Sequence, residues 1–203
     1  MITRYQIQPR GNMQVTTDDQ ANWIRVSAPL PQELQTLATT YGLPATYLAA
    51  ATDQHENARV EGLNPADQVP GLIVLRYPVE TTSETGFDQY NTVPMTMILL
   101  NDRVITITHD PLQAFDDLAQ QKLSPKPEEF ALEVLWLVLH QFVIAMDKLN
   151  DETKQIERSL GKAAKNTQLY QLMAMQKGLV FFDASWDHSG TCLLYTSPSP
   201  RDV

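Results

Sequence analysis

Two groups of carboxylates are the residues of this chain with the clearest potential for chemistry. The first group is Asp53, Glu56 and Glu61. The second group comprises Asp147, Asp151, Glu152 and Glu157. A hard divalent cation prefers oxygen ligands and keeps most of its water molecules, so sparse carboxylates at a subunit boundary could bind one weakly. The alternative for the second group is a solvated helix face whose carboxylates pair with neighbouring basic side chains. Those neighbours are Lys148, Lys154 and Arg158.

Other reactive side chains give weaker signals. The four histidines are His55, His109, His140 and His188, and none has a metal-binding spacing such as HxxxH or HExxH. His140 lies in an apolar run, so we interpret it as a core or interface histidine. Turn chemistry explains His109 and Asp110 as well as catalysis would. The sequence has no glycine-rich phosphate loop and no GxSxG nucleophile elbow. We therefore predict that the chain is not an enzyme, and we assign no catalytic or cofactor-binding residue.

Composition and charge narrow the class of protein further. The formal net charge of -9 argues against a nucleic-acid partner, which requires clustered lysine and arginine. The hydrophobic fraction of 43% is sufficient for a core in one or two domains. The N-terminus lacks the apolar segment of a signal peptide, so we expect the chain to begin in the cytosol. Residues 134–146 are the longest apolar run, but His140 and Gln141 interrupt it, which favours a buried helix over a membrane span.

The C-terminal residues have an unusual sequence. The run from Cys192 to Asp202, CLLYTSPSPRD, matches the in-frame translation of a transposase-type sequencing-library adapter. We therefore expect residues 187–203 to be a doubtful or artefactual tail, and the natural reading frame to be interrupted before Cys192. Cys192 is also the only cysteine, so the rest of the chain offers neither a disulfide nor a thiolate metal site.

The first 124 residues predict a mixed α/β domain with a β-sheet and short helices. Pro31 suits the first turn of a short helix whose apolar stripe is Leu34, Leu37 and Tyr41. A second short helix, with Leu48 on its inner face, is expected over residues 44–52. The remaining predicted elements are strands over 3–8, 22–27, 57–63 and 72–77, a β-hairpin of 93–100 with 104–108, and a helix over 111–121.

Residues 125–186 predict an antiparallel hairpin of two long helices, which makes the overall class α+β. Pro125 and Pro127 mark the expected domain boundary. From Glu128 the first helix carries a heptad seam. The seam consists of Leu135, Phe142, Leu149 and Ile156, with the companion series Leu139, Met146, Thr153 and Leu160. The first half of this helix is apolar nearly all round, so we expect other structure to cover it. The second helix should begin at Asn166 or Thr167.

The order of these segments resembles the CorA family of magnesium transporters. The resemblance extends over about residues 23–182. The residues that carry it are 23–26, 31–34, 43–44, Asp53, 56–61, 90–94, 97–99, 104–107, 147–149, 155–157, 166–169 and 176–182. Each segment is degenerate alone, whereas their order and spacing together are specific.

The resemblance implies the function of a longer protein. It implies a cytoplasmic regulatory domain followed by a stalk helix and two membrane helices, with a Gly-Met-Asn signature at the pore mouth. It also implies a homopentamer at the cytoplasmic face of the cell membrane that transports Mg²⁺ and binds Mg²⁺ between subunits in its closed state. The residues present here would end before the stalk and the pore. An alternative is a freestanding cytosolic scaffold whose helical hairpin pairs with partner helices.

One departure from the family pattern concerns the regulatory metal. In well-known members an acidic residue of the second short helix contributes to the metal site between subunits. The corresponding helix here contains Tyr47, Leu48 and three alanines, without a carboxylate. Asp53 and Glu56 lie further on, and the partner carboxylate would come from the missing stalk. We therefore leave the metal ligands unassigned.

Overall fold

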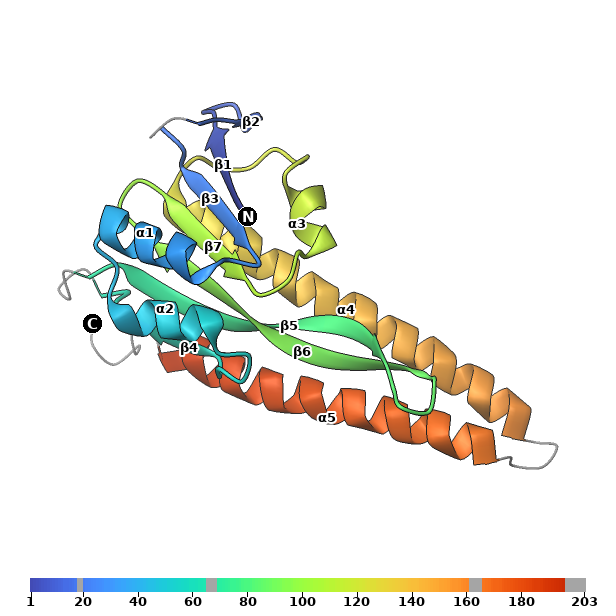
Figure 1. The fold of residues 1–203 in the computed structure, drawn as a ribbon. Coiled ribbons are helices and arrows are strands. Elements are labelled where there is room, and N and C mark those ends of the chain that lie inside the picture. The colour runs from blue at the N-terminus through green and yellow to red at the C-terminus, as the bar shows by residue number, and fades with distance from the viewer. Residues whose placement is uncertain (18–19, 65–68, 161–165, 196–203) are drawn as a thin grey trace, which may run out of the picture.

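A computed structural model describes the chain over residues 1–17, 20–64, 69–160 and 166–195, with only the backbone described for 159–160 and 186–195. The molecule is α+β, as predicted, and has a mixed seven-stranded sheet in the order β2-β1-β3-β7-β6-β5-β4 (Figure 1). The strands are β1 Ile2–Ile7, β2 Met13–Val15, β3 Trp23–Ser27, β4 Arg59–Glu61, β5 Gly71–Thr82, β6 Asp88–Leu99 and β7 Val104–Thr108. The helices are α1 Pro31–Tyr41, α2 Ala45–Thr52, α3 Gln113–Leu118, α4 Pro127–Leu160 and α5 Asn166–Tyr195.

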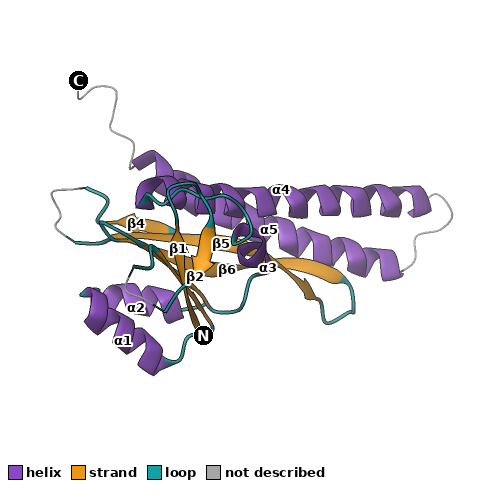
Figure 2. Ribbon diagram, turned by 90° about the horizontal axis from the view of Figure 1, so that it is seen from above, coloured by secondary structure: helices purple, strands orange, loops and turns teal. Residues whose placement is uncertain are grey.

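The sheet separates two apolar layers. Figure 2 shows α1 and α2 on one side of the strands and the two long helices on the other. Successive strand residues point to opposite faces, so Ile105 and Ile107 pack in the layer beneath α1 and α2, whereas Val104 packs in the layer with α3 and α4. The predicted α1 stripe is confirmed at Leu34 and Leu37, which are both buried.

The layer beneath α4 is organised around Trp23 of β3. Its ring stacks on Tyr5 with centroids 4.6 Å apart and lies 5.1 Å from the ring of Phe130. The indole Nε1–H donates a hydrogen bond of 2.9 Å to Thr106 Oγ1, which satisfies the polar atom of a fully buried side chain. Phe130 and Val134 belong to α4, so the start of the long helix shares this core with the sheet. The division of the chain at residues 124 and 125 stays a prediction.

The β5–β6 hairpin is longer than predicted. Both strands have 12 residues, and the pairing continues to Thr82 and Asp88. The sequence indicated only 72–77 and 93–100, because Pro78 is unusual inside a strand and the extension is largely polar. Two shorter strands also differ from expectation. No strand was predicted at β2, and β4 covers three residues of the predicted 57–63.

The expectations about the helices are met in part. Leu48 of α2 is half-buried and packs, as predicted, against the layer that contains the buried Tyr47 and Ala50. The predicted seam of α4 is buried at Leu149 and Ile156, whereas Met146 of the companion series is exposed. The first half of α4 is not covered all round, since only its sheet-facing side is buried. The side chain of Leu160 and residues 161–165, in the predicted connection, lie outside the described residues.

Candidate docking groove between the two long helices

An open apolar groove runs between α4 and α5, with a volume of about 740 Å³. The helices run antiparallel and side by side in Figures 1 and 2. The residues that line the groove recur at helical spacing on both α4 and α5. They are Leu139, Phe142, Val143, Met146 and Asp147 from α4, and Gln176, Leu179, Val180, Phe182 and Asp183 from α5. Each helix therefore directs one apolar stripe toward the sheet and a second into the groove.

The floor of the groove is fixed by aromatic contacts. Phe182 of α5 meets Phe142 of α4 edge to face, with centroids 5.3 Å apart, and lies 5.5 Å from the ring of Tyr90 on β6. Gly178 permits this approach, because a Cβ atom there would lie 3.3 Å from both the Cβ and the backbone nitrogen of Tyr90. The β5–β6 extension, which the sequence did not predict, therefore shares a buried apolar cluster with both helices.

Several large apolar side chains stay exposed along the two helices. Val180 in the groove is 61% exposed, and Trp136, one turn before the groove on α4, is 71% exposed. The other exposed apolar residues of these helices are Leu132, Val143, Ile144, Met146, Leu169, Tyr170, Leu172, Met173, Leu179 and Phe181. Exposed apolar side chains that gather along a groove, as Val143, Met146 and Val180 do, mark an interaction site rather than ordinary monomer surface.

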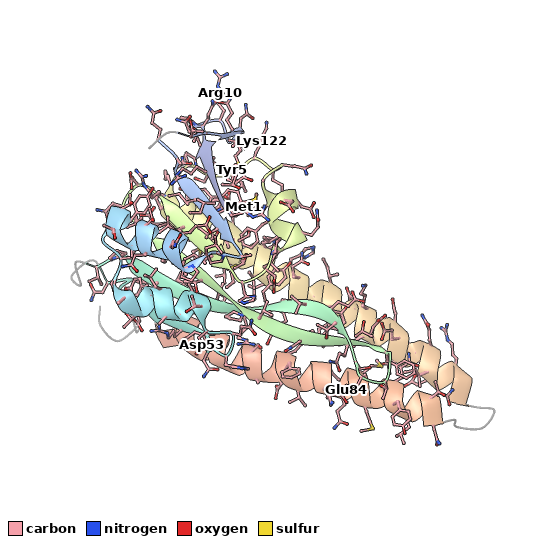
Figure 3. All side chains as sticks on the ribbon, in the orientation of Figure 1. Met1, Tyr5, Arg10, Asp53, Glu84 and Lys122 are labelled. Carbon is pink, nitrogen blue, oxygen red and sulfur yellow. The ribbon has the colours of Figure 1, made fainter. Side chains whose placement is uncertain are left out.

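The two carboxylate groups identified in the sequence lie in separate parts of the molecule. Figure 3 places Asp53 at the end of α2 and Glu84 at the tip of the β5–β6 hairpin. In the first group, Glu56 accepts a hydrogen bond of 3.0 Å from Arg59 Nε, and Glu61 forms an ion pair with Nη1 of the same guanidinium. Asp53 Oδ1 accepts the backbone N–H of His55 at 2.8 Å.

The second carboxylate group is partly engaged by lysines. Lys154 Nζ lies 3.1 Å from Asp151, as the solvated-face interpretation predicts. Lys148 instead reaches across to Glu80 of β5, at 2.7 Å. Within the described residues, no three His, Cys, Asp or Glu side chains are grouped so that they could hold a metal ion.

Glu152 faces the carboxylates of the β5–β6 hairpin. Burial raises the pKa of Glu152, and the nearby Asp88 and Glu80 raise it further, although Lys148 opposes them. Because the folded-state pKa lies above the unfolded one, the ionised form destabilises the fold at neutral pH, and protonation removes that cost as the pH falls through the folded-state pKa.

We expect Glu152→Gln to raise the free energy of unfolding at pH 7 by up to about 1 kcal/mol, by removing this repulsion. The advantage should disappear below the ordinary glutamate range, where Glu152 is protonated in both states. Urea unfolding between pH 4 and pH 8 measures this, and Glu157→Gln at an exposed position of the same helix is the matched control. Equal effects of the two substitutions at every pH would contradict the assignment.

The histidines are dispersed. His140 is exposed on α4, so it is not a core histidine, and the alternative of an interface histidine stays a prediction. His109 Nε2 lies 2.8 Å from Gln54 Nε2, and its Nδ1 lies 3.1 Å from Asp110. The side chain of His188 lies outside the described residues.

The model of one protein family matches residues 18–193, described as the CorA-like Mg²⁺ transporter protein. The chain belongs to this family. A search of curated protein sequences found no match. Helix α4, over Pro127–Arg158, has the length and composition of a membrane span, but Val134 and Val138 lie in the core beneath the sheet, and core helices also have this composition.

Solved structures of CorA-like proteins show the same fold. The complete CorA magnesium transporter from Methanocaldococcus jannaschii superposes with a TM-score of 0.76 at 18% identity, and covers 98% of this chain. The soluble domain of that protein gives 0.78 at 20% identity, with 98% of this chain and 80% of that one covered. The ZntB cytoplasmic domain from Vibrio parahaemolyticus gives 0.70 at 12% identity, with 95% and 77% covered. This chain spans 64% of the length of the complete M. jannaschii protein.

The expected metal chemistry of a CorA-like protein has little support in the described residues. Glu56 and Glu61 share Arg59, which leaves them poorly suited to replace the water molecules of Mg²⁺. We therefore assign no regulatory metal ligand. The groove is the feature that sequence reasoning identified only in part. The Leu139 and Met146 series was recognised as part of the heptad seam of the first long helix, and both residues line the groove.

Proposed function

We propose that this chain is the cytoplasmic regulatory domain of a CorA-like Mg²⁺ transporter, and that the protein continues into a stalk helix and a transmembrane pore. The family match over residues 18–193 carries the proposal. The groove supports it, since a further helix packed between α4 and α5 would cover Val143, Met146 and Val180. Members of the family are transporters, which fits the prediction that the chain is not an enzyme.

The proposal includes a location, a partner and an ion. The protein would lie at the cytoplasmic face of the cell membrane, form a homopentamer, and carry Mg²⁺ as its transported ion and as a regulatory ligand between subunits. The net charge of -9 supports the regulatory part, because several acidic chains around one axis repel each other and divalent cations between them relieve that repulsion.

The first test is the nucleotide sequence of the source gene beyond the codon for Phe182. We expect it to encode a long helix and then two apolar segments of about 20 residues each, with Gly-Met-Asn between them. A stop codon shortly after Phe182 would contradict the proposal. It would favour the alternative, a freestanding scaffold whose groove accepts a partner helix.

The isolated chain should not reproduce the assembly of the complete protein. We expect it to be monomeric or weakly associated and prone to aggregation, because the apolar groove stays exposed without the continuing chain. It should also conduct no ions. Sedimentation velocity over a range of protein concentrations measures the association state. A stable pentamer of the isolated chain would show that the membrane segments are not needed for assembly.

A further inference from the structure

Arg76 of β5 supplies hydrogen bonds at a point where the sheet cannot. The β6–β7 pairing begins at Met95, so the backbone of Thr92 lies beyond the end of β7. On the β5 side, Thr92 stands opposite Pro78, which has no N–H to donate. The Arg76 guanidinium donates through Nη2 to the carbonyl oxygen of Thr92, and through Nε to Thr92 Oγ1 at 3.1 Å. A buried carbonyl without a partner is costly, so these bonds stabilise the end of the sheet.

The same guanidinium also binds the segment between α2 and β4, residues 53–58, which we call the acidic loop. Arg76 Nη1 donates to the carbonyl oxygens of Glu56 at 2.9 Å and Gln54 at 3.3 Å. Burial lowers the pKa of Arg76, and the carboxylate of Asp53 opposes that shift. A partly buried cation held by carbonyl oxygens fixes the loop to the sheet through directional bonds.

A third contact extends this network to α5. Ser185 of α5 is buried, and its Oγ lies 3.0 Å from Thr92 Oγ1 and 2.7 Å from the carbonyl oxygen of Phe181. Thr92 is also buried, and its hydroxyl oxygen is hydrogen-bonded to both Arg76 and Ser185. A cavity of about 210 Å³ lies between the acidic loop and α5 and is lined by all three side chains. Across that cavity, hydrogen bonds to Arg76 and Thr92 of the sheet link the loop with the helix.

We propose that Arg76, Thr92 and Ser185 form a latch that couples the conformation of the acidic loop to the position of α5 around Ser185. The loop carries the exposed Asp53 and the Arg59-bound Glu56, so a ligand or neighbouring molecule that displaces it would also displace α5. The coupling acts in the reverse direction as well, because linkage between two sites is reciprocal. The latch is a property of this chain and does not depend on the proposed transport function.

The latch predicts an effect of α5 on the loop. The N–H groups of His55 and Glu56 are hydrogen-bonded to Asp53, so their exchange with solvent requires the loop to open. We expect Ser185→Ala to accelerate this exchange about fivefold, the factor that corresponds to one lost hydrogen bond. Thr92→Val should accelerate it more, because both bonds to the hydroxyl are lost. Hydrogen–deuterium exchange of the whole chain, read by mass spectrometry, measures the effect.

Two further variants separate coupling from general destabilisation. Thr153→Ala removes a similar hydroxyl bond within α4, to the carbonyl oxygen of Leu149 at 2.8 Å, and should leave the loop unchanged. Ser185→Thr keeps the hydroxyl, and the cavity offers room for its methyl group, so exchange should stay near that of the unmodified chain. In all of these variants, hydrogen exchange of the β7 amides should stay constant, which shows that the fold as a whole is not destabilised. Faster exchange confined to α5 in Ser185→Ala, or equal acceleration by Thr153→Ala, would overturn the latch.

Discussion

Replacing Trp23 with alanine is expected to lower the free energy of unfolding by about 3–5 kcal/mol, the range for loss of a large buried aromatic side chain. Trp23 is fully buried and contacts Tyr5, Phe115 and Phe130, so the cavity would face β1, α3 and α4 together. The substitution also leaves Thr106 Oγ1 without its indole donor. Since small domains are stable by only about 5–15 kcal/mol, much of the total stability depends on this residue.

Trp136→Ala is the matched control, because it removes the same side chain from an exposed position on α4. We expect it to change the unfolding free energy by less than about 0.5 kcal/mol. Guanidinium unfolding followed by far-UV circular dichroism compares the two variants. Similar losses of stability would mean that Trp136 is packed in the folded chain and that its exposed surface has been misassigned.

Introducing a charge into the groove should have opposite effects in the isolated chain and in the complete protein. In the isolated chain, Val180→Glu is expected to reduce aggregation and the binding of an apolar dye, because Val180 is exposed there. In the complete protein the same glutamate would be buried against the continuing helix, where an unpaired charge costs about 3–5 kcal/mol. Assembly of the detergent-solubilised protein should therefore be lost, as measured by size-exclusion chromatography with light scattering.

Val15→Glu is the control for this experiment, since it makes the same change at a position that is 70% exposed on β2, away from the groove. We expect it to leave assembly of the complete protein intact. Normal assembly of Val180→Glu would show that no segment of the complete protein covers the groove.

The sequence predicted those parts of the fold whose apolar residues follow a single period. The apolar and β-branched runs of β3, β5 and β7 and the stripe of α1 are such local patterns, and all four elements were found. The far half of the β5–β6 hairpin could not be predicted in this way. Its stability comes from long-range contacts such as that between Tyr90 and Phe182, and not from a local pattern.

The candidate site was predictable in composition but not in geometry. Leu139 and Met146 were recognised as an apolar series, yet periodicity alone cannot tell whether such a series faces the partner helix or a groove beside it. The same limit applies to His140, which lies with the apolar Trp136 and Val143 on a side of α4 that this chain leaves exposed. The latch residues gave no sequence signal, because Arg76, Thr92 and Ser185 are brought together only by the pairing of β5 with β6 and the packing of α5.

We propose that this domain belongs to a protein that moves Mg²⁺ across a membrane. The most direct test is Mg²⁺ uptake into proteoliposomes that contain the complete gene product, followed with a Mg²⁺-sensitive dye trapped inside. We expect uptake that depends on the inserted protein and is absent when this 203-residue chain is added alone. A complete protein that inserts into the vesicles and assembles, yet carries no Mg²⁺, would contradict it.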